Sequence, residues 1–472
     1  MASEANEENK LNRRAFLKGA TVSMGAVLIA ACAPASQAPA SSSSGGAAPA
    51  AVGEPVPALL RSGANEEEYF NRVIDMFEQQ HPDVKINRVF APGGDEYITK
   101  LDLMIASGDP PAIYAPFSSR GYRYYAARGL SQELDELATR DNLKLDNFHA
   151  DGMKGCHWNG KLMALPLDLW PHVLFYNKTL FDEAGVQVPP TDWTDKSWTY
   201  DTLTETAKAL TKKEGDETSQ FGIVFDFKEW PTGWLFGGDW FPKETYETGI
   251  ITEFVGHKDE RVIAATQWYA DLMLKDNIAP TPAQSQRVSS GGSGPFFMSG
   301  KVAMNLGNIG SLSQYATIKE FEWGTAALPF PPDGSDRHMH VWIDFWSMIK
   351  GVKNLEGSWE FLKFMVSEEA QKIYPCEYGP QSALSSLSQY WIDLQKKTLP
   401  NLDDAQFKVL TEAPKYEQID PENWTVNMSI VNGQGLQPAL DRIWLGEGTS
   451  RDIITAAAPD IQKIIDESKV IS

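Results

Sequence analysis

A chain of 472 residues with 42% hydrophobic residues is long enough for two or three globular domains, each with its own core. Its 42 Lys and Arg stand against 63 Asp and Glu, which gives a formal net charge of −21. This balance excludes the basic face that nucleic-acid binding needs, and the 3 cysteines exclude a disulfide-dense scaffold or a zinc site made of cysteine alone.

Residues 1–31 are expected to be an export signal rather than part of the fold. Asn12-Arg13-Arg14-Ala15-Phe16-Leu17-Lys18 resembles a twin-arginine motif, and the apolar run 20–31 behind it is too short to span a bilayer. Leu28-Ile29-Ala30-Ala31-Cys32 resembles a lipobox, so we expect cleavage before Cys32 and lipidation of its thiol. An uncleaved anchor helix with an incidental cysteine is the alternative.

The mature protein is expected to begin with a flexible linker at the cell membrane. Residues 32–57 are almost uncharged and consist mainly of Ala, Ser, Pro and Gly, a composition that buries too little apolar surface to fold. We therefore expect an extracytoplasmic lipoprotein, tethered through Cys32, whose globular body starts near residue 58.

Short strands and helices alternate along the body. Asn65 and Glu68 resemble a capping box, and the apolar residues behind them recur at helical spacing until His81-Pro82. Runs 84–90 and 112–115 have the pattern of strands. This strand–helix–strand rhythm predicts an α/β layer architecture.

Four blocks of the body, taken in chain order, resemble a known family. They are 76–85, 165–186, 297–304, and 328–331 with 359–365. The most specific contains Phe175-Tyr176-Asn177-Lys178-Thr179-Leu180-Phe181-Asp182-Glu183-Ala184-Gly185-Val186, and the third is Phe297-Met298-Ser299-Gly300-Lys301-Val302-Ala303-Met304. In this order, behind a lipobox, they resemble the bacterial extracellular solute-binding proteins (family 1) of sugar-type ABC transporters.

The resemblance implies a two-lobed α/β fold of the periplasmic-binding-protein-like type II class, with a hinge and an interlobe cleft. Lobe 1 is expected to hold residues 58–167 and 326–374, and lobe 2 residues 168–325 and 375–472. The resemblance also implies a monomer without a cofactor, which closes on its ligand and is then recognised by membrane permease subunits.

A cleft for carbohydrate needs aromatic plates for the apolar sugar faces and carboxylates or amides for the hydroxyl groups. Asp168 and Trp170 follow a predicted strand at the expected lobe crossover; a solvated hinge acid and a packed indole are the alternative. Trp230 and Trp234 are four residues apart, so one helical turn would place both on one face. Core packing of that turn is their alternative.

A third group alternates along a predicted strand. Trp342, Asp344 and Trp346 would share one face, and a carboxylate between two indoles suits a sugar platform, because a carboxylate in an ordinary core needs partners. A surface-facing edge strand is the alternative.

The remaining candidates lie in loops. Asn308 follows a strand where many relatives place a Trp after Gly, which this chain lacks. Ser62 and Ser118 end two predicted lobe-1 strands, the usual place for ligand contacts in α/β folds. Tyr378 could close over the ligand or pack within its loop.

Two further patterns leave alternatives open. Cys156 and Cys376 form either a disulfide or two separate buried thiols. His338 and His340 alternate near Asp336, but no third ligand is spaced to complete a metal site, so a solvated loop is expected and no metal.

The expected function is capture of a mono- or oligosaccharide and its delivery to an ABC permease, with no chemistry. Stacking would fall to Trp170, Trp234, Trp342 and Trp346, and hydroxyl acceptance to Asp168 and Asp344. Two alternatives remain: an exported glycoside-cleaving enzyme, for which paired acids beside indoles would also serve, and a receptor for a non-sugar solute such as a glycerophosphate. The excess of negative charge argues against an anionic ligand.

Overall fold

The computed structural model describes residues 53–469, except 64, 117–119, 216, 228–229, 289–292, 338, 417 and 420–423. The twin-arginine motif, Cys32 and most of the expected linker lie outside the described residues, as do Ser118 and His338. Within the described part of the chain, no helix combines the length and the apolar character needed to cross a membrane.

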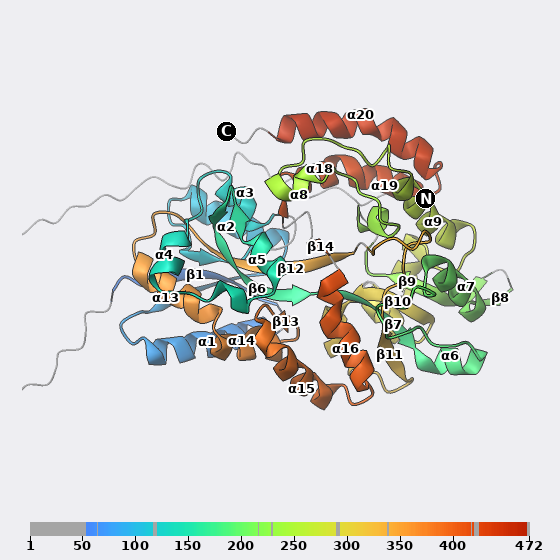
Figure 1. Ribbon diagram of the computed structural model, residues 1–472, viewed down its shortest axis with the longest axis horizontal. Helices are drawn as coiled ribbons and strands as arrows, with labels where there is room; N and C mark the ends of the chain where they lie inside the picture. Colours follow the sequence, from blue (N-terminus) through green and yellow to red (C-terminus); the bar gives the residue numbers. More distant parts are fainter. Residues whose placement is uncertain are drawn as a thin grey trace, which may run out of the picture. The chain divides into compact units, whose positions relative to one another are not determined.

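The first sheet combines strands from widely separated parts of the chain (Figure 1). In spatial order its strands are β13 (Gln381–Ser382), β6 (Ala164–Trp170), β12 (His340–Met348), β3 (Ile113–Tyr114), β1 (Val56–Arg61) and β2 (Ile86–Ala91), with β14 (Gln418–Ile419) paired to β12. Strand β1 runs parallel to β2 and β3, whereas β12 runs antiparallel to β3 and β6.

Both faces of the first sheet are covered by helices, as its apolar strands require. Phe70, Val73, Ile74 and Phe77 of α1 (Glu66–Gln80) are buried in one core with alternate residues of β1. On the opposite face, Leu59 joins a separate core with the apolar residues of α2 (Asp95–Ala106). The predicted strand–helix–strand rhythm of this region is confirmed.

The second sheet has the order β11 (Trp323–Ala326), β7 (His172–Asn177), β10 (Val302–Asn308), β9 (Glu217–Phe225) and β8 (Lys212–Glu214). Strands β9 and β10 run parallel, and β7 runs antiparallel to β10 and β11. A small hairpin joins β4 (His157–Trp158) to β5 (Lys161–Leu162).

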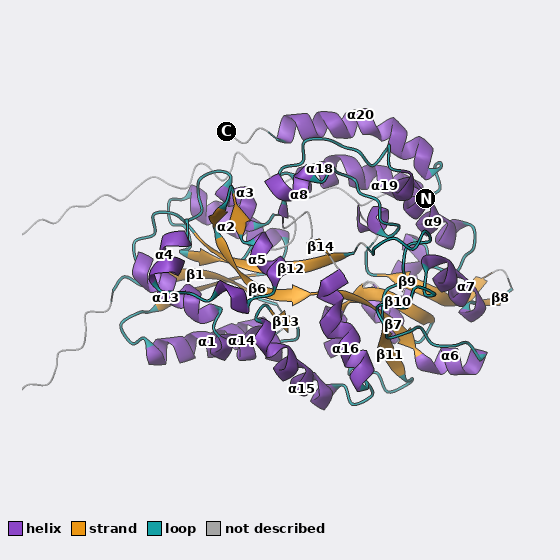
Figure 2. Ribbon diagram, viewed as in Figure 1, coloured by secondary structure: helices purple, strands orange, loops and turns teal. Residues whose placement is uncertain are grey.

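The other helices surround the two sheets (Figure 2). They are α3 (Tyr122–Ala126), α4 (Asp135–Arg140), α5 (Ala150–Gly155), α6 (Lys178–Ala184), α7 (Tyr200–Leu210), α8 (Glu244–Thr248), α9 (Glu260–Leu274), α10 (Pro282–Val288), α11 (Ser293–Met298), α12 (Leu312–Tyr315), α13 (Leu355–Met365), α14 (Glu368–Gln371), α15 (Ser388–Thr398), α16 (Asp404–Glu412), α18 (Met428–Val431), α19 (Gln437–Trp444) and α20 (Ser450–Ser468). Short 3₁₀ turns are η2 (Leu145–Asn147), η3 (Trp230–Trp234), η4 (Ile309–Ser311), η6 (Ser385–Leu387) and η7 (Ala413–Tyr416); η5 (Lys372–Glu377) and η8 (Asn432–Leu436) are π-helical.

The chain passes between the two sheets at few places. Pro171 alone separates β6 of the first sheet from β7 of the second, and residues 327–339 carry the chain back from β11 to β12. Strands β13 and β14, which lie in the stretch expected for lobe 2, pair with β6 and β12 of the first sheet. These strands lie in the region where a hinge is expected, and the exact lobe boundaries stay a prediction.

One local expectation is wrong, and one pair of open alternatives is resolved. Asn65 has a backbone φ of 67° and makes no capping hydrogen bond, so the capping box with Glu68 does not form. Instead, the carboxylate of Glu66 accepts a hydrogen bond from the Gly63 N–H at 3.2 Å. Cys156 and Cys376 are separate buried thiols rather than a disulfide; the Cys156 thiol donates to the Gly152 carbonyl of α5 at 3.3 Å.

Candidate functional site

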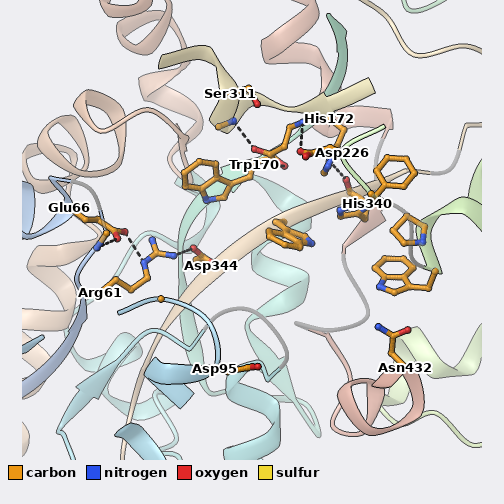
Figure 3. A pocket seen from close by; sticks show the side chains of 18 of the residues that line it. Arg61, Glu66, Asp95, Trp170, His172, Asp226, Ser311, His340, Asp344 and Asn432 are labelled. Atoms are coloured by element: carbon orange, nitrogen blue, oxygen red, sulfur yellow. Dashed lines mark hydrogen bonds and ion pairs between the residues drawn. The ribbon is translucent and has the colours of Figure 1, made fainter. Parts of the chain in front are cut away.

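A cavity of about 1010 Å³ is lined by residues from both sheets. It lies beyond the carboxyl ends of β1, β9 and β10 and beside the strands that carry the chain between the sheets (Figure 3). Ligands of open α/β sheets bind at such strand ends, because loops there can diverge around a solute. The cavity is therefore the candidate binding site of this chain.

Aromatic rings form much of its wall. Trp170 ends β6, Trp230 begins η3, Trp342 lies near the start of β12, and Tyr378 follows η5; all four line the cavity. The side chain of Trp342 is 41% exposed, which is unusual for an indole in a sheet strand. The exposed face of an indole is an apolar surface that the C–H face of a sugar ring can cover.

Trp170 and Tyr378 form one aromatic corner of the wall. Their ring centroids are 6.3 Å apart in an edge-to-face arrangement, and Tyr378 stacks on the buried Tyr374 at 5.3 Å. The backbone of Trp170 pairs with Trp342 across β6 and β12. The indole N–H of Trp170 donates to the Asp168 carboxylate at 2.9 Å, which fixes the plane of the ring.

Beneath this corner, one guanidinium holds several acids together. Arg61, the last residue of β1, places Nε 2.8 Å from Glu66 Oε1 and Nη1 2.5 Å from Asp344 Oδ2, so that it lies between the two carboxylates (Figure 3). It also donates to the Tyr374 hydroxyl, which in turn donates to Glu66 at 2.9 Å. Because the Arg61 side chain is buried, this network is shielded from solvent.

Asp168 and Asp344 pair with each other in the β6–β12 ladder, and both carboxylates lie close to the positive charge of Arg61. Burial raises the pKa of Asp168 well above its usual range, and the nearby Asp344 raises it further, while Arg61 opposes the shift. Burial also raises the pKa of Asp344, against the opposing charge of Arg61. Two carboxyls so close together retain a proton to higher pH than exposed aspartates do.

The wall that continues toward the second sheet is polar. Asp226, which follows β9, accepts hydrogen bonds from the Ser293 hydroxyl at 3.0 Å and the Asn308 N–H at 3.3 Å. The Asn308 amide donates to the Trp170 carbonyl at 3.0 Å and accepts from the Gly310 N–H at 2.7 Å. Asn308 thus ties the end of β10 to the crossover, and it also lines the cavity.

Six of the predicted site residues line the cavity and four others do not. The six are Trp170, Trp230, Asn308, Trp342, Asp344 and Tyr378. Ser62 lies between two lining residues, Arg61 and Gly63, directly after the end of β1, but is not itself part of the wall. Ser118 lies outside the described residues.

The other three are buried behind the wall. Asp168 is fully buried beneath Trp170. Trp234 is fully buried, and its ring contacts Trp230 edge-to-face at 4.9 Å, so both rings share a side of the turn but only Trp230 reaches the cavity. Trp346 is fully buried and packs on Phe70 of α1. The face of β12 that carries both indoles therefore lines the cavity at Trp342 and is covered by the core at Trp346.

Several lining residues were not predicted. Arg61 and Asp226 follow the rule that polar residues at strand carboxyl ends reach the ligand site, and that signal could have found them. Asn432 and Gln437 come from the π-helical turn η8 and the start of α19, where no periodicity marks a site. Asp95 approaches from the first turn of α2.

The expectation of a solvated loop at His340 is wrong. His340 is the first residue of β12 and is only 3% exposed. It lies against His172, the first residue of β7, with ring centroids 4.2 Å apart. Within the described ranges, no three His, Cys, Asp or Glu side chains are grouped so that they could hold a metal ion.

Two curated proteins show what the sequence of this chain is similar to. A putative binding protein of Brucella abortus (strain 2308) is 25% identical over 430 residues, 89% of this chain and 95% of that protein. A maltooligosaccharide ABC transporter solute-binding lipoprotein of Streptococcus pneumoniae (strain ATCC BAA-255 / R6) is 24% identical over 58% of this chain and 60% of its own length.

Solved structures share the fold. An ABC substrate-binding protein from Listeria monocytogenes in complex with cycloalternan is 20% identical, with a TM-score of 0.70 over 87% of this chain and 99% of that one. The predicted two-lobed, mixed α/β fold is thus confirmed. The family described as bacterial extracellular solute-binding protein matches residues 63–372, more than half of the sequence, and this chain belongs to that family.

Proposed function

We propose that this protein is the substrate-binding component of an ABC importer and that it captures a neutral carbohydrate in the cavity between its two sheets. One observation carries the proposal: the cavity combines four aromatic rings with carboxylate and amide side chains. Rings cover the apolar faces of sugars, and acidic and amide oxygens accept several hydroxyl protons. The Listeria and Streptococcus relatives, by their names, bind cycloalternan and serve maltooligosaccharide transport.

The energetics are sufficient for a receptor. Each aromatic contact contributes about 0.5–1.5 kcal/mol beyond area burial, and each hydrogen bond to a charged group about 1.5–3 kcal/mol. Two or three of each reach roughly the 8 kcal/mol of a micromolar complex before the cost of association is subtracted.

The charge of the cavity supports a neutral ligand over a glycerophosphate. Glu66, Asp95, Asp226 and Asp344 line it, whereas the lining cation Arg61 already contacts two of these carboxylates. A phosphate dianion would enter a region of negative potential and would have to compete for that guanidinium. This argument favours sugars without an acidic group.

The same geometry supports binding without catalysis. A glycosidase needs two carboxyl groups that flank the scissile bond, one of them free to protonate the leaving oxygen. Asp168 is fully buried outside the cavity wall, and Asp344 is held by Arg61 at 2.5 Å. Asp168 is thus out of reach of a substrate, and Asp344, which lines the cavity, is already held in an ion pair.

The cellular setting is part of the proposal. The twin-arginine motif and the lipobox support export and lipidation at Cys32, and the linker would let a monomeric body reach its permease. Radiolabelled palmitate incorporation that disappears in a Cys32→Ser variant would support the anchor, and undiminished incorporation would contradict it.

A thermal-shift screen of the purified full chain tests the function. The panel holds glucose, maltose, maltotriose, mannotriose, cycloalternan and sn-glycerol 3-phosphate. A ligand that binds only the folded state raises the unfolding midpoint, by about 2.7 kcal/mol of stability at 100 times its Kd. We expect a shift with at least one oligosaccharide, none with the phosphate, and no release of reducing ends on incubation. A shift with the phosphate alone, or sugar hydrolysis, would overturn the proposal.

A further inference from the structure

Among the described residues, the passages from β6 to β7 and from β11 to β12 each carry a buried histidine. His172 begins β7 directly after Pro171, and His340 begins β12 after the return segment 327–339. Both are 3% exposed, and both line the cavity (Figure 3). Their rings are 4.2 Å apart, so the two crossovers contact each other through these side chains.

His340 is the centre of the aromatic wall. Its ring lies 5.3 Å from Trp230 and 5.8 Å from Trp342, the indoles that reach the cavity from the second and the first sheet. Phe227 approaches both imidazoles at 6.0 Å. A single imidazole is therefore in contact with both indoles.

His172 fixes the position of His340 through the backbone. Its Nδ1 lies 3.0 Å from the His340 carbonyl, and because a carbonyl only accepts, Nδ1 carries the proton and donates. This hydrogen bond sets the tautomer of His172 and anchors the first residue of β12. The contact spans 168 positions of sequence and joins the two crossovers directly.

Both imidazoles are neutral at neutral pH. Burial lowers the pKa of His172 to about 4, and the charge of Asp226 opposes that shift. Burial lowers the pKa of His340 well below its usual range, and the neighbouring His172 lowers it further. Asp226 is the charged group that faces this pair, and Trp230, Trp342 and Phe227 complete its surroundings.

We propose that His340 is a positioning residue for the ligand: it sets the separation of the Trp230 and Trp342 plates, and His172 holds it in place. The inference rests on the proposed carbohydrate function and adds the residue that spaces the plates. A ring of this size keeps the two indoles apart by a fixed distance, and a smaller side chain would let them collapse toward each other or toward the empty volume. The two histidines also connect the two crossovers to the indole plates, because His172 binds the His340 backbone and His340 contacts Trp230 and Trp342.

A double-mutant cycle in the full chain tests the proposal. Maltotriose is titrated by calorimetry at pH 7.5, or mannotriose if maltotriose gives no thermal shift. We expect His340→Ala to weaken binding about tenfold, because two stacking contacts lose their alignment. In a Trp342→Ala background the same substitution should cost only about threefold, because the alignment of Trp230 is then all that His340 still supports. His340→Phe, which keeps a neutral ring, should restore binding to within about threefold.

His257→Ala is the matched control. His257 stacks on Phe254 at 5.6 Å and is not part of the cavity wall, so its loss should lower the unfolding midpoint without changing affinity. If His340→Ala melts below the assay temperature, His340→Gln removes the ring with less loss of volume and takes its place.

Two outcomes overturn the inference alone: an unchanged Kd in the folded His340 variant, or an equal loss with and without Trp342. A wild-type chain that binds no sugar of the panel overturns the proposed function and this inference together.

The pH profile of the affinity gives a second readout. Affinity should fall as pH drops toward 4, and His172→Gln should flatten that fall; an unchanged profile in His172→Gln would contradict the role of the pair.

Discussion

Replacing Arg61 by Met should show how strongly the stability of the buried network around Glu66, Asp344 and Tyr374 depends on one cation. The guanidinium contacts Glu66 at 2.8 Å and Asp344 at 2.5 Å, and both partners are buried. The hydrogen bonds that Arg61 donates to Asp344 and to the Tyr374 hydroxyl involve a charged group, so their loss, at about 1.5–3 kcal/mol each, gives roughly 3–6 kcal/mol, close to the about 3–5 kcal/mol typical of breaking a buried ion pair. We expect Arg61→Met to lower the free energy of unfolding by that amount at pH 7.5.

The pH dependence gives this prediction its sign. Arg61 opposes the raised pKa values of Asp168 and Asp344, so its removal raises them further in the folded state. A carboxyl whose folded pKa exceeds the unfolded value contributes stability below the unfolded pKa, and this contribution is lost as pH rises through the folded pKa. The deficit of the variant should therefore be largest at pH 7.5 and shrink toward pH 4.

Urea denaturation at several pH values measures that deficit. Arg61→Met combined with Asp344→Asn should recover part of the stability, because one uncompensated carboxylate is gone. Arg72→Met is the control: Arg72 pairs with Glu377 at 2.7 Å on the exposed surface, where an ion pair contributes about 0–1 kcal/mol. A cost for Arg61→Met no greater than for Arg72→Met, or a deficit that grows as pH falls, would refute the reasoning.

Three further outcomes follow from the burial of particular side chains. His172, with a pKa lowered to about 4, should cost the folded state roughly 3 kcal/mol as pH falls from 6.5 through 4, and urea curves of His172→Gln should lack this loss; equal curves would contradict it. Trp346→Ala should lower the free energy of unfolding by about 3–5 kcal/mol, whereas Trp342→Ala should cost much less stability but weaken sugar binding, and the reverse pattern in melts and titrations would be inconsistent with their burial. Because Cys156 and Cys376 are buried free thiols, a reductant should leave the unfolding midpoint unchanged and a thiol reagent should react only after unfolding; a midpoint lowered by the reductant would indicate a disulfide.

Local patterns predicted the elements well, because they depend on neighbours in the chain. The helix behind Asn65 buries the residues that its periodicity marked, and the strands at 84–90 and 112–115 form close to where they were expected. Aromatic residues near strand ends, such as Trp170 and Trp342, were found for the same reason. The spacing of apolar residues indicates which side of a helix or strand a residue faces, and the prediction of that side was correct.

The burial depth of a side chain and its contacts with distant parts of the chain could not be predicted in the same way. Trp342 and Trp346 belong to one strand, but at about 3.3 Å per residue they are roughly 13 Å apart, so one lies in the cavity and the other under α1. The partners of Arg61 come from positions up to 313 residues away, which no local pattern reveals. His340 looked like a loop residue because its contacts, His172 and Trp230, come from other segments.

The measurement that bears most directly on the account is a calorimetric titration of the full chain with an oligosaccharide from the thermal-shift panel, carried out on wild type, Trp342→Ala and Leu445→Ala. Leu445 is 69% exposed and lies outside the cavity wall, so it controls for the loss of an exposed apolar side chain. We expect saturable binding of one ligand per chain, weakened about tenfold by Trp342→Ala and unchanged by Leu445→Ala. Equal affinities in all three proteins, or no saturable binding in the wild type, would contradict a sugar held between the indoles of this cavity.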